Sequence, residues 1–189
     1  ESVRLHEGLS KAEAMNRGAE EARTPYVFFL GADDLVMPGA LARLADALDA
    51  DPGCDFAYGD YEFFGAMTGV MQSYEWEPWR AVYTSCWPGV FMIRRDVFRD
   101  TKGFITRSAF EDWDYYMTLA EQERRGVRVP GVSFRYRRAA SGRREQSNRH
   151  RLREERELMR AAHPRLMARR REMQAEAGVS LPVRVGYPI

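Results

Sequence analysis

The fold is decided by the stretch YVFFLGADDLVMPG, residues 26 to 39. Its first five residues form an unbroken apolar run, which is typical of a strand covered on both faces, as in a parallel sheet. Two adjacent carboxylates, Asp33 and Asp34, follow this predicted strand, and Pro38 then opens a predicted helix. The sequence therefore places two acids at the carboxyl end of a strand, the edge where open α/β sheets bind ligands.

The neighbouring segments extend this unit on both sides. Residues 8 to 23 predict a helix, because Ser10 and Glu13 have the spacing of a capping box ahead of an apolar stripe. Residues 38 to 53 predict a second helix and residues 55 to 64 a second strand. Strand, helix and strand in this order favour a crossover with a parallel pair, and therefore an α/β layer.

The second half of the chain is less regular. Residues 65 to 88 are rich in glycine, proline and aromatic side chains, and they predict an aromatic loop region with short pieces of order. Residues 89 to 98 predict a strand followed by a turn, and residues 109 to 126 predict a helix. Two short strands are expected in residues 127 to 138, on either side of a Pro-Gly pair.

Arginine and glutamate dominate the C-terminal segment, residues 141 to 189, which we separate from a domain of residues 1 to 140. Sparse apolar positions predict one or two surface helices broken near Pro164. The interleaved charges favour a solvated helical appendage over a nucleic-acid or anionic-lipid binding helix. The three scattered histidines are expected on the surface: His6, His150 and His163.

Composition limits the classes of function. The chain has 189 residues, 44% of them hydrophobic, enough for one sizeable core. Its 29 Lys and Arg nearly cancel its 28 Asp and Glu, so no overall charge favours nucleic acid or membrane. Cys54 and Cys86 form neither a disulfide framework nor a zinc motif. With no apolar run near the roughly 20 residues of a membrane span, we expect a cytoplasmic protein, and peripheral contact with the inner membrane face stays open.

Two acidic sets are candidates for chemistry. Asp33 and Asp34 offer the oxygen ligands that Mg²⁺ or Mn²⁺ prefers, although they could merely polarise a loop and cap the following helix. Glu111, Asp112 and Asp114 open the predicted helix of residues 109 to 126, where acids also compensate the helix dipole. Neither acidic set alone identifies a function. The order of the two sets along the chain makes a functional interpretation stronger.

Taken in order, the segments resemble a family 2 glycosyltransferase of the GT-A type, from residue 8 to about residue 140. The matching stretches are GLSKAEAMNRG, GADD, YGD, GVFMIRRDVF and EDWDYYMTLAEQ. The resemblance implies a Rossmann-like, mixed and mainly parallel sheet flanked by helices. It also implies metal-assisted, inverting transfer of a sugar from a nucleotide-sugar donor to a hydroxyl of a saccharide, lipid-linked or protein acceptor.

The resemblance also implies roles for individual residues. Asp33 would ligate Mn²⁺ or Mg²⁺ at the donor diphosphate, and Asp34 would support it or contact the donor. Asp112 would be the general base that deprotonates the acceptor hydroxyl. Glu111 would orient the acceptor or hold the loop.

Two tryptophans are favoured as neighbours of the acceptor. Trp87 and Trp113 could stack on sugar rings, because the apolar face of a pyranose packs well on an aromatic plane; core packing is the alternative.

The chain departs from the family's pattern at three points. Gly31 stands where the family has the first acid of its DxD motif, and Ala139 and Ala140 stand where many members have a histidine. The sequence also begins after the family's strand-helix-strand unit for the nucleotide, as expected of a piece of a longer enzyme. A non-catalytic binding or assembly module with this fold is therefore the alternative function.

Overall fold

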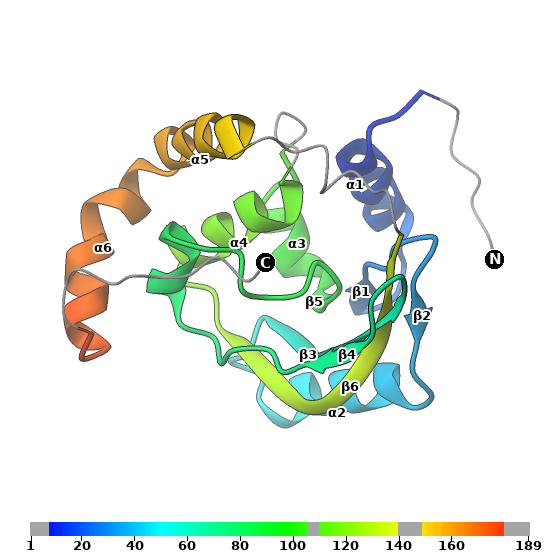
Figure 1. Ribbon diagram of the computed structural model, residues 1–189. Coiled ribbons are helices and arrows are strands. Elements are labelled where there is room, and N and C mark those ends of the chain that lie inside the picture. The colour runs from blue at the N-terminus through cyan, green and yellow to red at the C-terminus, as the bar shows by residue number, and fades with distance from the viewer. Residues whose placement is uncertain (1–7, 106–109, 140–148, 180–189) are drawn as a thin grey trace.

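The computed structural model describes residues 8–105, 110–139 and 149–179, and its centre is a mixed sheet with helices on both faces (Figure 1). Five strands follow the order β1-β5-β3-β6-β2, and β4 pairs with β3 off this path. Their bounds are β1 Tyr26–Phe28, β2 Leu35–Val36, β3 Phe56–Gly65, β4 Gly69–Met71, β5 Met92–Arg94 and β6 Gly126–Arg138.

The sheet is mixed, as predicted, but in the described part of the chain only β3 and β6 pair in parallel. β1 and β3 run in the same direction without being neighbours, because β5 lies between them and is antiparallel to both. The predicted adjacent parallel pair is therefore wrong. β5 comes later in the chain than β1 and β3. The local sequence pattern around those two strands therefore could not show that β5 lies between them.

β1 is covered on both faces, as the unbroken apolar run predicts. Val27 and Phe29 belong to the main core cluster, whereas Tyr26 and Phe28 pack against the smaller cluster formed around Leu44, Leu48 and their neighbours. The strand therefore stabilises two layers at once, which explains why the alternation of an ordinary half-buried strand is missing.

β6 is one long strand, not the two short strands predicted. Its parallel pairing with β3 passes from Val129 to Val132 opposite the step from Gly59 to Asp60. The extra residues, Pro130 and Gly131, form an irregularity, and Gly131 has a φ of 98°. A Pro-Gly pair predicts a strand break, but a bulge can accommodate both residues while the ladder continues.

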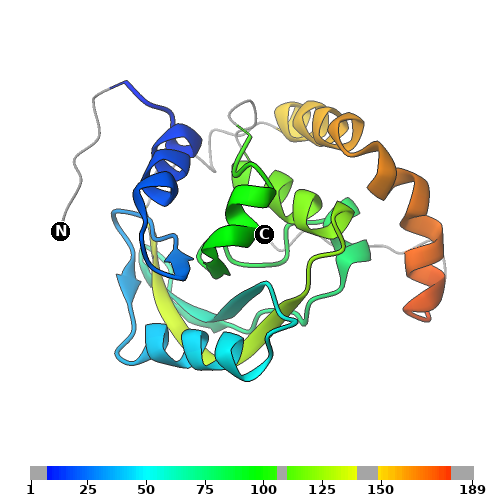
Figure 2. The same cartoon turned by 180° about the vertical axis from the view of Figure 1, so that it is seen from behind.

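The helices lie on opposite faces of the sheet. α1 (Lys11–Glu21), α3 (Arg95–Asp100) and α4 (Glu111–Glu121) contribute to the main core, and α2 (Ala40–Ala50) covers the other face (Figure 2). The predicted capping box of α1 is confirmed by reciprocal hydrogen bonds between Ser10 and Glu13. α3 follows β5 directly, where a turn was predicted.

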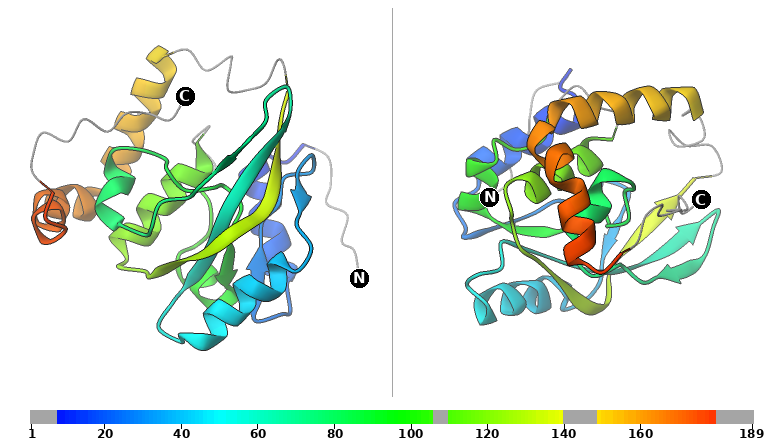
Figure 3. Two further views of the ribbon diagram at one scale, coloured as in Figure 1. Left: turned by 60° about the horizontal axis from the view of Figure 1, so that its bottom comes forward. Right: turned by 90° about the vertical axis from the view of Figure 1, so that its left-hand side faces the viewer.

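The C-terminal segment forms two helices, α5 (Arg149–Ala162) and α6 (Pro164–Glu176), which confirms the predicted break at Pro164. α6 packs on α4 and on the 3-10 helix η1 (Pro78–Val82) (Figure 3). Met159 and Leu166 belong to the main core, so the segment contributes to the core as well as to the surface. His163 is only 3% exposed, so its predicted surface position is wrong. No helix in the described ranges has the length and apolar character to cross a membrane.

Candidate functional site

The two adjacent acids lie in the turn between β1 and β2, fastened to the end of β6. The main-chain N–H of Asp34 donates to the carbonyl of Gly31 at 3.1 Å and closes this turn. The main-chain N–H of Arg137 donates to Asp34 Oδ1 at 3.0 Å, and its Nε donates to the carbonyl of Asp33 at 3.1 Å. These hydrogen bonds hold both the backbone and the carboxylate of Asp34 in place. The residue is only 9% exposed.

Gly31 creates the space into which these carboxylates point. A Cβ at this position would lie 2.7 Å from Asp34 Oδ2 and 3.3 Å from Asp33 Oδ1. Two carboxylate oxygens from adjacent residues thus converge on a volume that a side chain at position 31 would fill. Within the described ranges, no group of three or more His, Cys, Asp or Glu side chains could hold a metal ion. The pair fits a hard cation that takes few protein ligands and completes its shell with phosphate and water.

The environment of Asp34 favours a nearby cation. Burial raises the pKa of its carboxyl group above the ordinary value, and the charge of Asp33 acts in the same direction. The hydrogen bond from the Arg137 N–H opposes this shift, as do the charges of Lys11 and Arg137. A carboxylate whose charge is incompletely compensated gains from a bound positive ion.

The second acidic set opens α4, as predicted. Asp112 Oδ1 accepts a hydrogen bond from the main-chain N–H of Trp113 at 2.8 Å. A Cβ at Gly89 would lie 2.7 Å from Asp112 Oδ2, so this carboxylate lies against the bare backbone of the segment before β5. Glu111 is 9% exposed and forms an ion pair with Lys11, with 2.5 Å between Oε1 and Nζ.

Lys11 connects the two acidic sets, a role that was not predicted from the sequence. Burial lowers the pKa of its amine, but the hydrogen bond and charge of Glu111 and the charge of Asp112 outweigh burial and raise it. The charge of Lys11 in turn lowers the pKa of Asp34. A signal was present in the sequence, because a lysine at the first position of a helix opposes the helix dipole and needs a compensating contact.

The structure places both candidate tryptophans inside the main core. Trp113 is 1% exposed and donates from Nε1 to the carbonyl of Ala81 at 2.7 Å. Trp87 is 4% exposed and donates from Nε1 to the carbonyl of Glu75 at 3.4 Å. These contacts fix the aromatic region against α4, and contact with an acceptor stays a prediction for both residues.

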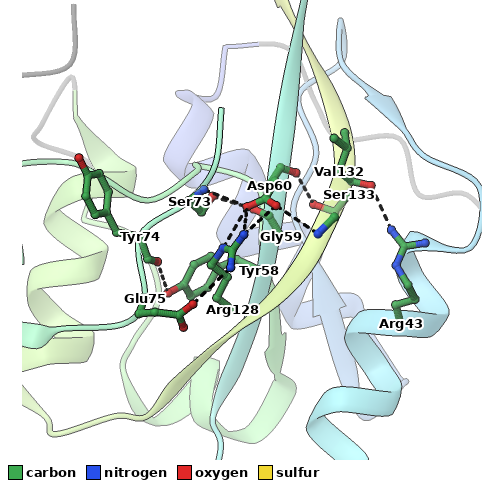
Figure 4. Close-up of polar contacts among 11 residues, drawn as sticks. Arg43, Tyr58, Gly59, Asp60, Ser73, Tyr74, Glu75, Arg128, Val132 and Ser133 are labelled. Atoms are coloured by element: carbon green, nitrogen blue, oxygen red, sulfur yellow. Dashed lines mark hydrogen bonds and ion pairs between the residues drawn. The ribbon is translucent and has the colours of Figure 1, made fainter. Parts of the chain in front are cut away.

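A second polar centre, also not predicted from the sequence, lies at the irregularity of β6 (Figure 4). Asp60 accepts from Arg128 through both carboxylate oxygens, with Nη2 at 2.9 Å from each. It also accepts the main-chain N–H groups of Ser73 at 2.9 Å and Gly131 at 3.1 Å. Through these contacts Asp60 connects β3 to β6 and to the segment after β4. We call this group of contacts the clamp at Asp60. An aspartate in the middle of an apolar strand was the available signal.

The chain is similar to known proteins in its family and in its fold. A family model described as Glycosyl transferase family 2 matches residues 1–110. No curated protein matches the chain significantly. Among solved structures, a mannosyltransferase, PcManGT from Pyrobaculum calidifontis in complex with GDP-Man and Mn²⁺, has a TM-score of 0.51 and 17% sequence identity. The match covers 95% of this chain and 58% of that chain, and at this identity it shows a GT-A-type fold.

Proposed function

Because the chain belongs to glycosyl transferase family 2, we propose that it transfers a sugar from a nucleotide-sugar donor to an acceptor hydroxyl, with inversion at the anomeric carbon. The observation that carries the proposal is the position of Lys11. It is paired with Glu111, and its charge lowers the pKa of Asp34, which supports placing the two acidic sets in one site. Donor and acceptor chemistry would then take place at the same end of the sheet.

Asp112 is the general base of the proposed reaction. Its carboxylate takes the proton of the acceptor hydroxyl as the acceptor oxygen bonds to the anomeric carbon and the bond to the diphosphate oxygen breaks. The hydrogen bond from the N–H of Trp113 and the close backbone of Gly89 fix the direction of this carboxylate. Glu111, held by Lys11, orients the acceptor.

On the donor side, Asp33 and Asp34 would hold Mn²⁺ or Mg²⁺. Such an ion supplies positive charge against the negative charge that develops on the departing diphosphate. The GDP-Man and Mn²⁺ bound by the similar mannosyltransferase support a nucleotide-sugar donor and a divalent cation here. We place the reaction in the cytoplasm, with a saccharide, lipid-linked or protein acceptor and with peripheral membrane contact as an open alternative.

The test compares Asp112→Asn with Asp96→Asn. Both carboxylates lie in the first turn of a helix, but the Asp96 side chain is 84% exposed. Release of nucleoside diphosphate from a panel of nucleotide sugars, with Mn²⁺ and sugar acceptors, measures the rate. We expect Asp112→Asn to lower it by about 100-fold or more and Asp96→Asn to leave it unchanged. An undiminished rate in Asp112→Asn would remove the assigned base.

The alternative is a binding or assembly module that keeps the fold without transfer. Gly31 favours this alternative, because a glycine stands in place of the first acid of the family's DxD motif. Asp33 and Asp34 are then the acids that remain in this turn. Calorimetry of the 189-residue chain with GDP or UDP, with and without Mn²⁺, separates the two. Saturable, metal-dependent binding counts against the module, and absent binding counts for it.

A further inference from the structure

We infer that the docking of α5 and α6 on α4 is a pH-dependent switch built around two buried side chains and one partly buried carboxylate. This histidine cluster consists of Asp114 and Glu121 on α4 and His163 at the junction between α5 and α6. The inference concerns how the chain holds its own C-terminal helices. It does not depend on sugar transfer.

Both ring nitrogens of His163 face a carboxylate. Nε2 lies 3.1 Å from Asp114 Oδ1, and Nδ1 lies 3.3 Å from Glu121 Oε2. A neutral imidazole has one N–H and can donate to only one of these acids, whereas the imidazolium can donate to both. The geometry therefore fits the protonated ring, which places a positive charge between two negative ones.

Burial increases the dependence of the docking on this charge. Asp114 is 2% exposed and His163 is 3% exposed. Among the residues that the structure describes, Asp114 Oδ2 has no hydrogen-bond partner, so the contact through Oδ1 carries much of the compensation of this buried carboxylate. If the ring loses its proton, one ring nitrogen becomes an acceptor that faces a carboxylate, and the contact turns repulsive.

Glu121 connects this charge to the start of α6. Its Oε1 accepts the main-chain N–H groups of Arg165 at 2.8 Å and Leu166 at 3.1 Å, which are groups of the first helical turn without intrahelical partners. Its other oxygen holds His163. Glu121 therefore caps α6 and also binds the junction between α5 and α6. A change in the charge of His163 affects both contacts.

Two further polar contacts of this interface are made without histidine. From α5, Arg160 donates from Nη2 to the carbonyl of Val82 at 3.2 Å. From α6, Gln174 accepts from the hydroxyl of Tyr83 at 3.1 Å. Asp114 and Glu121 are the charged groups that act on His163, so its proton controls the pH response.

The sign of the pH dependence follows from the pKa of His163. Burial lowers this pKa, but the hydrogen bonds and charges of Asp114 and Glu121 outweigh burial and raise it. A raised pKa in the docked state means that docking is most stable below the ordinary histidine pKa of about 6.5. The stabilisation is lost as the pH rises through the higher pKa of the docked ring. Met159 and Leu166 belong to the main core through apolar contacts that carry no charge, so we expect the helices to loosen at high pH without unfolding of the core.

Amide hydrogen exchange of α6 in the 189-residue chain tests the switch, with rates corrected for intrinsic exchange at each pH. Between the pKa values of the free and docked ring, the opening constant of α6 should rise by up to about tenfold per pH unit, because one proton is released. His163→Gln should open more readily at low pH and show no such slope. Tyr83→Phe, the matched control, should raise opening by one factor at all pH values and keep the slope.

A second measurement covers the case in which His163→Gln does not fold. Glu121→Gln removes one acid and keeps the size of the side chain, so the slope should move to lower pH. Direct titration of the His163 ring by NMR in the unmodified chain should give a pKa above the ordinary value. A pH-independent opening constant in the unmodified chain, or a ring that titrates below the ordinary value, overturns the inference.

Discussion

At the scale of single residues, the site depends on two glycines that let carboxylates approach the backbone. Gly31 leaves room for Asp33 and Asp34, and Gly89 leaves room for Asp112. In each case a Cβ would lie 2.7 Å from a carboxylate oxygen, closer than such atoms pack. The absence of a side chain at position 31 is therefore part of the geometry of the acid pair, and not only the loss of an acid.

Gly31→Ala tests this role. Its methyl group should displace the Asp34 carboxylate and weaken Mn²⁺ binding by about tenfold or more, because the two oxygens no longer converge. Calorimetric titration with Mn²⁺ measures the affinity. The control is Gly18→Ala in α1, where a Cβ meets nothing within 4 Å; it should keep the affinity and stabilise the chain by about 0.5–1 kcal/mol. Equal affinity in Gly31→Ala and the unmodified chain would contradict the proposed metal position.

At the scale of elements, the clamp at Asp60 explains how one strand continues through Pro130 and Gly131. The carboxylate accepts the N–H of Gly131, a main-chain donor at the irregularity of the ladder, and it pairs with Arg128 three positions earlier. The side chains of Asp60 and Arg128 are 11% and 9% exposed. Replacing one partner leaves the other charge buried and unpaired, which costs more than the pair itself contributes.

Asp60→Ala should therefore lower the free energy of unfolding by about 3–5 kcal/mol. The matched control is Glu62→Ala, two residues along the same strand, whose partner Arg135 is 38% exposed. The control should lose about 1 kcal/mol or less, because exposed ion pairs contribute little. Urea denaturation followed by circular dichroism measures both, and equal losses would show that Asp60 is no more than a surface pair.

At the scale of the whole molecule, the C-terminal helices and the sheet share one core. Met159 and Leu166 lie in the same cluster as the α4 side chains Tyr115 and Leu119. The charged surface of α5 and α6 is consistent with the predicted solvated face. The buried side of each helix was not predicted, because the segment has few apolar residues. Folding of this segment is thus expected to be coupled to folding of the domain.

Leu166→Ala tests the coupling. Leu166 is 2% exposed, and its truncation should destabilise the whole domain by about 2–5 kcal/mol through lost packing and a cavity. Leu158→Ala on α5, where the side chain is 66% exposed, should change stability by less than about 0.5 kcal/mol. Unfolding should remain a single transition in both. If Leu166→Ala instead melts only α5 and α6, the segment is an independent unit.

Local patterns predicted the elements that local forces control. The capping box of α1, the doubly covered run of β1 and the break at Pro164 depend on residues near one another in sequence, and the structure confirms them. Burial of His163 was not predictable in this way. Its partners, Asp114 and Glu121, lie 49 and 42 residues away in the sequence. The residues near position 163 therefore do not show that the ring lies between two carboxylates.

The family, the acid pair after β1 and the acidic start of α4 can be predicted from the sequence, because they are short patterns of residue type and order. Three features became visible only in the folded chain: β5 separates β1 from β3, Lys11 pairs with Glu111 and acts on Asp34, and Gly31 leaves space for two carboxylates. The physical reason is that sheet order, ion pairing and close approach depend on distances between residues far apart in the chain. Those distances exist only after the layers have packed.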